Sequence, residues 1–198
     1  MATTIFQNVI QKAGSSNTQN SLEARNWLRQ KAAEVRAVSP KATIQQGPIL
    51  TNRITTGNMY LFAYDPKTKE DLPYYDRFPL VFPFRKVKDG FYGINMHYLP
   101  PLLRARLMDA LYDTVNNDKM DETTRLRINY RILQSAAKFR YFEPCVKHYL
   151  NNHVKTRFLL VDPKQWDVAL FLPLERFAKS NKLKVYADSK KKITNNGR

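Results

Sequence analysis

The first 48 residues contain two segments whose apolar side chains repeat with helical spacing. The first segment contains Ile5, Phe6, Val9 and Ile10. This spacing predicts a short docking helix. Residues 21–36 are rich in Ala, Leu, Arg, Gln and Glu, which favour a second helix. Ser39-Pro40 and Gly47-Pro48 then interrupt regular structure. We therefore expect residues 1–48 to form an N-terminal helical arm and linker that another chain orders.

The second predicted helix has two distinct faces. An apolar stripe includes Leu28 and Ala32, and another face presents Arg25, Arg29 and Arg36. Arginines in a row suit a phosphate backbone or a neighbouring subunit. A solvated helix face explains the same pattern, so both interpretations stay open.

The middle of the chain has the composition and alternation of strands. Residues 59–64 are aromatic and apolar and lie between turn residues. In residues 78–84, Phe82 and Phe84 alternate with Val81 and Pro83, which predicts one pair facing inward and the other outward. The prolines favour an edge strand or a bulge. The turn at residues 88–90 predicts a hairpin in which Gly90 is able to take a positive φ, with residues 91–98 as the returning strand.

The remainder of the chain is mainly helical by pattern. We expect helices at residues 101–115, 121–137 and 144–150, and short helices at 166–171 and 174–178. A strand competes for residues 126–132, but segment length favours the helix. Residues 182–186 alternate like an edge strand. The expected fold is α+β: a small aromatic-rich antiparallel sheet or partial barrel packed with several helices over residues 49–188, followed by a basic tail at 189–198.

The charge is strongly positive and unevenly distributed. The net charge is +16, and residues 133–198 contain 14 basic and 5 acidic side chains. Such a balance attracts nucleic acid, an acidic membrane or an acidic protein. Solubility alone requires a net charge of only about 2–8. No run of residues has the length and apolarity of a membrane helix, so we expect a basic protein that does not span a membrane.

The residues that carry common catalytic chemistry are sparse. Cys145 is the single cysteine, and the three histidines lack the spacing of a zinc site. No glycine-rich phosphate loop is present. We therefore expect no metal, no cofactor and no catalytic residue. One alternative is a metal-dependent nuclease built on the carboxylates of Asp65, Glu70, Asp71 and Asp76, although the spacing of a strand-borne nuclease motif is absent.

Residues 72–83 combine aromatic side chains and prolines to an unusual degree. One interpretation is a rigid strand that fills the core. The other is an exposed aromatic surface formed by Tyr74, Tyr75 and Phe78 beside basic residues, which would stack unpaired bases while the cations bind phosphates.

Basic side chains that suit phosphate contacts are found in two places. The predicted helix at 121–137 and the residues after it carry Arg127, Arg131, Lys138 and Arg140. The tail carries Lys190, Lys191 and Lys192. These seven side chains are the predicted nucleic-acid-binding residues.

Four runs of sequence resemble small virion proteins of T-even-type contractile-tailed phages, of the DNA end protector type. They are GNMYLFAYDPK at 57–67, LPYYDRFPL at 72–80, NMHYLPP at 95–101 and HVKTRF at 153–158. The resemblance spans about residues 57–190. It implies a non-enzymatic virion protein, assembled in the host cytoplasm, whose partners are DNA or other virion proteins and whose role is DNA end protection or head and neck completion. A baseplate or neck subunit that binds only proteins is the alternative within the same resemblance.

Overall fold

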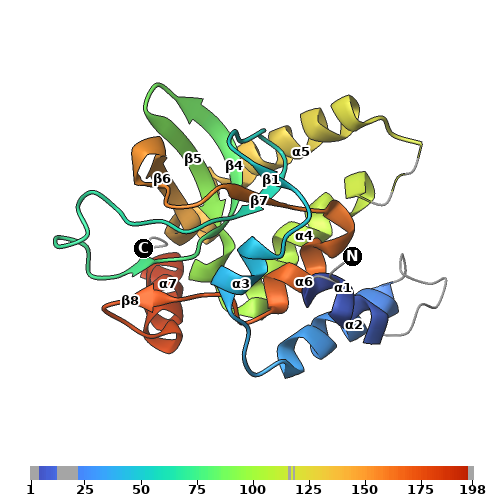
Figure 1. Ribbon diagram of the computed structural model, residues 1–198, viewed down its shortest axis with the longest axis horizontal. Helices are drawn as coiled ribbons and strands as arrows, with labels where there is room; N and C mark the ends of the chain where they lie inside the picture. Colours follow the sequence, from blue (N-terminus) through green and yellow to red (C-terminus); the bar gives the residue numbers. More distant parts are fainter. Residues whose placement is uncertain (1–4, 13–21, 116, 118, 196–198) are drawn as a thin grey trace.

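A computed structural model describes residues 5–12, 22–115, 117 and 119–195 (Figure 1). Its α-helices are α1 (Ile5–Lys12), α2 (Leu22–Glu34), α3 (Pro40–Gln45), α4 (Pro101–Val115), α5 (Glu122–Ala136), α6 (Trp166–Phe171) and α7 (Lys182–Asn195). Its strands are β1 (Leu50–Thr51), β2 (Met59–Leu61), β3 (Tyr75–Asp76), β4 (Leu80–Val87), β5 (Gly90–Asn95), β6 (Val146–Leu150), β7 (Phe158–Val161) and β8 (Phe177–Ala178). Short 3-10 helices are η1 (Met96–Tyr98), η2 (Arg140–Cys145), η3 (Asn151–His153) and η4 (Pro163–Gln165).

The main sheet has six antiparallel strands in the order β1-β7-β2-β4-β5-β6, and β3 pairs with β8 in a separate ribbon. The six-stranded sheet curls so that distant strands approach each other. The ring centroids of Phe62, after β2, and Tyr149, in β6, are 5.4 Å apart. The connection from β6 to β7 pairs with the end of β2, because the Lys155 N–H donates to the Ala63 carbonyl at 2.8 Å. The predicted α+β fold with a partial barrel is confirmed.

Both faces of this sheet are buried, each in a different hydrophobic cluster. Met59, Leu61 and Phe82 point into the cluster that the helices cover. Tyr60 and Val81 point into an aromatic cluster inside the curl. The Phe82 and Phe84 pair therefore does occupy a different environment from Val81, as the alternation predicts. The outward half of that prediction is wrong, because all four residues from Val81 to Phe84 are buried.

The described part of the N-terminal arm forms helices that pack on the core. In Figure 1, α1 and α2 lie beside α6, at one end of the molecule. Phe6, Val9 and Ala32 are buried in the same cluster as Phe82. The predicted division at residues 48 and 188 stays a prediction, but the arm does not stand apart from the core.

The arginine face of α2 points into the protein. Arg25 and Arg29 are 5% and 7% exposed and form ion pairs with Asp109 and Asp167 at 2.8–3.2 Å. Of the two interpretations of this face, neither holds for these two side chains. They attach α2 to α4 and α6 and offer no charge to a phosphate backbone.

Three segments differ in type from the sequence prediction. Residues 144–150 were expected to be helical but form β6 from Val146 onward, because β5 offers a pairing edge. Residues 174–178 are extended because β8 pairs with β3. Residues 182–186 belong to α7, whose buried face contains Val185 and Ser189 at a spacing of four. The described part of the basic tail is therefore helical, and residues 196–198 lie outside the described residues.

Other predictions hold. The helix at 101–115 is α4, the helix at 166–171 is α6, and α5 begins after Asp121, whose carboxylate accepts the Thr124 N–H at 3.0 Å. The hairpin at residues 88–90 is confirmed, and Gly90 does not use its freedom to take a positive φ; among the described glycines only Gly57 has one. Gly90 is required by space instead: a Cβ there would lie 1.9 Å from the Tyr149 carbonyl oxygen.

The substitution Phe82→Ala tests the packing of the sheet on the helices. The Phe82 ring is fully buried and lies 4.9 Å from the Trp166 ring. Its removal leaves a cavity, so we expect the free energy of unfolding to fall by about 3–5 kcal/mol in urea denaturation. The matched control is Phe139→Ala, because Phe139 is 63% exposed and its loss should change stability by less than about 0.5 kcal/mol. Equal effects of the two substitutions would contradict this packing.

Candidate nucleic-acid interface

A groove of about 510 Å³ lies between β6, the end of α7 and the chain around β3. Four segments that are far apart in the sequence form it. Its aromatic and basic lining residues include Tyr74, Tyr75, Tyr98, Lys67, Lys147, His148 and Lys192. The groove thus combines part of the predicted aromatic surface with one lysine of the predicted basic tail.

The aromatic side of the groove is a set of packed rings. The Tyr74 centroid lies 6.1 Å from that of Tyr98, and both rings contact Phe177 of β8 edge-on. Burial raises the pKa of Tyr74, and the nearby Asp188 carboxylate, which hydrogen-bonds to it, raises it further. The tyrosine therefore stays a neutral phenol and adds no negative charge to a surface that is otherwise basic.

The cations of the groove come from three elements. Lys147, on β6, holds its ammonium 4.1 Å from the Tyr98 ring centroid. Burial lowers the pKa of Lys147 to about 8, and the charge of Lys192 also lowers it. Lys67 and Lys192 are exposed. A polyanion that entered the groove would stabilise the protonated form of Lys147.

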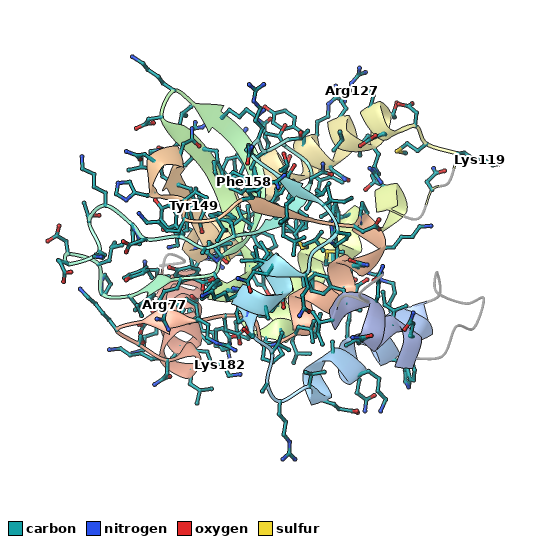
Figure 2. All side chains as sticks on the ribbon, in the orientation of Figure 1. Arg77, Lys119, Arg127, Tyr149, Phe158 and Lys182 are labelled. Carbon is teal, nitrogen blue, oxygen red and sulfur yellow. The ribbon has the colours of Figure 1, made fainter. Side chains whose placement is uncertain are left out.

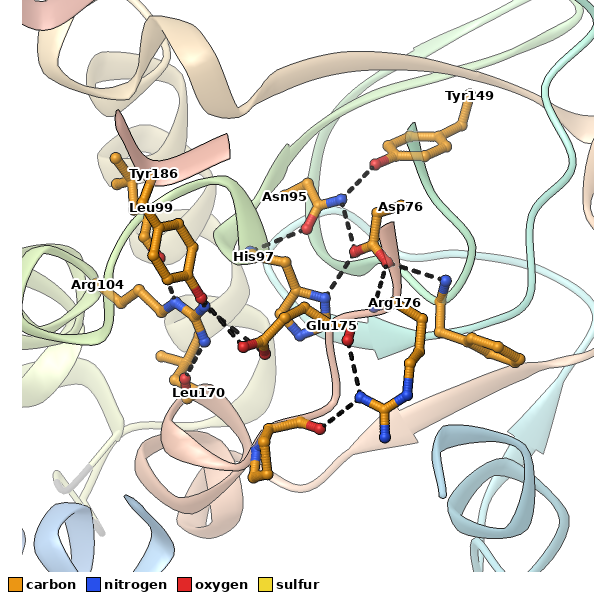
Figure 3. Close-up of polar contacts among 12 residues, drawn as sticks. Asp76, Asn95, His97, Leu99, Arg104, Tyr149, Leu170, Glu175, Arg176 and Tyr186 are labelled. Carbon is orange, nitrogen blue, oxygen red and sulfur yellow. Dashed lines mark hydrogen bonds and ion pairs between the residues drawn. The ribbon is translucent and has the colours of Figure 1, made fainter. Parts of the chain in front are cut away.

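Among the described residues that line the groove, Asp76 is the acidic one, and its carboxylate is already occupied (Figure 3). It lies 2.6 Å from the His97 Nδ1 and accepts hydrogen bonds from the Asn95 side-chain amide and from the N–H groups of Phe78 and Arg176. Burial on its own raises the pKa of Asp76, but the His97 ring and these backbone donors outweigh it and leave the pKa below its ordinary value. The carboxylate joins the β3–β8 ribbon to β5.

A second buried network attaches α7 to the core, also in Figure 3. The Arg104 guanidinium, 1% exposed, donates to the carbonyls of Leu99 and Leu170 and to the Tyr186 hydroxyl. That hydroxyl donates to the Glu175 carboxylate at 3.1 Å. Tyr186 is part of α7, so this network fixes the helix that carries Lys190, Lys191 and Lys192.

The seven predicted phosphate-binding side chains are all exposed. They form two groups, one on and after α5 and one on α7. Figure 2 shows Arg127 pointing away from α5 at the upper right, whereas Lys182, at the start of α7, lies at the lower left. Arg131 is on α5, one turn from Arg127, and Lys138 follows this helix. Arg140 begins η2, which packs on α7 and so lies between the two groups.

The structure separates the three residues of the predicted aromatic surface. Tyr74 and Tyr75 line the groove, but Phe78 lies in a different hollow beside Val38 and Pro40. Lys67 and Lys147 were not among the predicted site residues. Residues 146–150 do not alternate strictly between apolar and polar side chains, so no local signal indicates the strand that places Lys147 in the groove.

The comparisons with known proteins give one match. The family model described as "Phage T4 terminal DNA protecting protein" matches residues 7–195. The chain belongs to this family. The resemblance to the DNA end protector type is thereby confirmed. No curated protein and no solved structure matches the chain.

In this member of the DNA protecting family, the carboxylates considered for nuclease chemistry do not come together. Asp65 pairs with Lys69 at 3.2 Å, Glu70 lies 3.6 Å from Lys179, and Asp76 is buried against His97. Among the residues that the structure describes, no three His, Cys, Asp or Glu side chains are grouped to hold a metal ion. None of the described helices is long and apolar enough to cross a membrane.

The substitution Asp76→Asn tests the buried carboxylate that supports the groove. Its depressed pKa means that its contribution to stability is present above about pH 4, the ordinary pKa of aspartate, and is lost as the pH falls through the folded-state value. At pH 7 we expect the variant to lose about 3–5 kcal/mol of unfolding free energy, as when one partner of a buried pair is removed. The difference from the unsubstituted protein should shrink as the pH falls below 4.

The control is Asp71→Asn, because Asp71 is exposed near the same groove. It should change stability by less than about 0.5 kcal/mol at every pH. An Asp76→Asn protein as stable as this control at pH 7 would show that the carboxylate is not a structural junction.

Proposed function

We propose that this protein is a non-enzymatic virion component that binds the termini of phage DNA and shields them from nucleases. The observation that carries the proposal is the groove in which Tyr74, Tyr75, Lys67, Lys147 and Lys192 meet in a member of the DNA protecting family. Stacking rings beside cations bind nucleic acid without reading its sequence. Protection of a terminus requires this kind of recognition, since the protein must occupy the end whatever its bases.

The exposed cations outside the groove support the same function. Arg127, Arg131 and Lys138 have no ion pair with an acidic side chain in the described part of the chain, and the same holds for the three lysines at 190–192. Charges held free of internal partners are available to phosphates. A DNA duplex that contacts the α7 side also has Arg140 nearby, because η2 packs on α7. We assign phosphate contacts to these seven residues.

The proposed location is the virion, after assembly in the host cytoplasm, with DNA and neighbouring virion proteins as partners. We also propose that residues 1–48 are the part that contacts a neighbouring protein, residues 49–188 the part that binds DNA, and residues 189–198 an additional contact with DNA. Trp27, on the outer side of α2, is 38% exposed and offers an apolar contact there. Head or neck completion would follow from binding at the DNA end. A subunit that binds only proteins is the competing function.

A protection assay tests the proposal directly. Linear duplex DNA is incubated with an exonuclease, with and without the protein, and the surviving length is measured. We expect the protein to protect linear DNA, and we expect Lys190→Gln, Lys191→Gln and Lys192→Gln together to reduce protection. The slope of log affinity against log salt should fall by about 3 in this variant, about 1 for each lost phosphate contact.

The control removes the same charge from exposed lysines elsewhere, by Lys41→Gln, Lys119→Gln and Lys164→Gln together. It should retain protection and a salt slope close to that of the unsubstituted protein. If the unsubstituted protein protects no linear DNA, and its affinity for linear DNA equals that of the variant without Lys190, Lys191 and Lys192, the alternative of a subunit that binds only proteins is favoured.

The lowered pKa of Lys147 gives a second test, on pH dependence. At pH 7 the ammonium is charged, and at pH 9 it is mostly neutral because its pKa is about 8. We expect the salt slope for duplex DNA to fall by about 1 between pH 7 and pH 9. Lys147→Arg should keep the same slope at both pH values, since a guanidinium stays charged. Lys147→Met should show the lower slope at both, and a pH effect that survives in this variant would place its origin elsewhere.

A further inference from the structure

Another hollow, which we call the basic hollow, has a volume of about 440 Å³ and lies at the open end of the curled sheet. Arg53 in the loop before β2, Lys86 on β4 and Arg157 before β7 contribute three cations to it. Its described lining contains no acidic side chain. All three cations are exposed, and within the described part of the chain none of them forms an ion pair. The hollow is therefore a concentration of positive charge that the protein itself does not neutralise.

The surrounding backbone holds the Arg157 cation, and local hydrogen bonds order the loop that carries Arg53. The Arg157 guanidinium donates a hydrogen bond to the Leu50 carbonyl. The Arg53 N–H donates to the Thr51 hydroxyl at 3.1 Å, and that hydroxyl donates to the Arg53 carbonyl at 3.0 Å. The loop is thus closed on itself at the rim of the hollow. Positioned cations lose less entropy when an anion binds than free ones do.

The bottom of the hollow is apolar. Phe91 and Phe158, both buried, belong to the aromatic cluster inside the curl, and Ile54 and Val154 lie beside them. An apolar backing lowers the local dielectric, so a charge bound against it interacts more strongly with the cations than on an open surface. The asparagine amides of Asn52 and Asn151 add neutral donors at the rim.

We propose that this hollow binds the terminal phosphate of a DNA end, an inference that rests on the proposed function. A terminal phosphomonoester carries a charge of about −1.5 to −2 and three acceptor oxygens. A phosphodiester within the strand carries a single negative charge. Three converging cations with two guanidinium groups match the terminal group better, because arginine binds phosphate through paired hydrogen bonds. The hollow would thus distinguish an end from the interior of a duplex.

The position of the hollow agrees with this assignment. Leu150 lines the aromatic groove and the next residue, Asn151, lines the hollow. The two sites therefore adjoin at the connection between β6 and β7. A terminus bound in the hollow has its flanking strand on the side where the groove offers tyrosines and lysines.

The experiment measures the affinity of the full protein for three short blunt duplexes: one with 5′-phosphates, one with 3′-phosphates and one with hydroxyls at every end. We expect the unsubstituted protein to bind one phosphorylated duplex about tenfold more tightly than the duplex without terminal phosphates. Arg53→Gln with Lys86→Gln should abolish this preference. Binding to covalently closed circular DNA, which has no termini, should change little.

The matched control is Lys88→Gln with Lys155→Gln, which removes equal charge from exposed neighbours that do not line the hollow. It should retain the tenfold preference. Lys86→Gln alone is a further variant, because the exposed Lys86 side chain has no hydrogen bond or ion pair to another described residue, and it should reduce the preference with unchanged thermal unfolding.

The two proposals fail in different ways. A protein that protects linear DNA but binds all three duplexes equally would overturn the terminal-phosphate site and leave the proposed function standing. A preference that persists in Arg53→Gln with Lys86→Gln would also overturn the site. A protein that protects no linear DNA would overturn the proposed function itself.

Discussion

The six-stranded sheet has to bury both of its faces, and the rest of the structure follows from that requirement. A sheet with one wet face would alternate apolar and polar side chains. Here β4 begins with five consecutive buried residues, and β2 is buried throughout. The helices cover one face. On the other face no helical layer is needed, because the sheet curls until its own aromatic rings fill the interior.

That curl explains where the two hollows lie. A sheet closed only in part leaves openings, and the connection between β6 and β7 crosses the gap by pairing with residues 63–65. The groove and the basic hollow adjoin this connection. Their walls combine loops with strands of the sheet, and α7 also lines the groove. Buried hydrogen bonds such as that between Asp76 and His97 fix the strands. Sites on a rigid frame hold a ligand with less loss of entropy than sites on free loops.

Local patterns were sufficient for elements whose stability is local. The strand at Met59, the hairpin at residues 88–90, α4 and α5 all have turn or capping residues next to a clear period. The segments that were predicted wrongly depend on distant partners. β6 exists because β5 pairs with it, and β8 because β3 does, although their sequences are compatible with helix. The burial of Arg25 and Arg29 depended on Asp109 and Asp167, which lie about 80 and 140 residues away in sequence.

Only part of the candidate site could be predicted from the sequence, for the same reason. Tyr74, Tyr75 and Lys192 were singled out separately, but only the tertiary fold places them in one groove, and it adds Lys147 from a strand that was read as a helix. Lys86 lies among the basic residues near the predicted aromatic surface and Arg157 lies in the run at 153–158, but no local pattern predicts that these two cations and Arg53 line one hollow. Convergence of such residues is a property of strand order, which local periodicity does not encode.

The distribution of acidic side chains then determines which cations are left for a partner. Some acidic residues serve inside the protein: Asp76 and Glu175 are buried beside His97 and Arg104, and Asp167 pairs with the arginines of α2 together with the more exposed Asp109. Acidic side chains are not absent from the surroundings of the groove, since Asp188 bonds Tyr74 and Asp89 lies beside His148. In the described structure, however, Arg53, Lys86 and Arg157 of the hollow and the three lysines at 190–192 have no acidic ion-pair partner. Carboxylates that pair inside the protein leave these cations to direct a positive field outward, toward a polyanion.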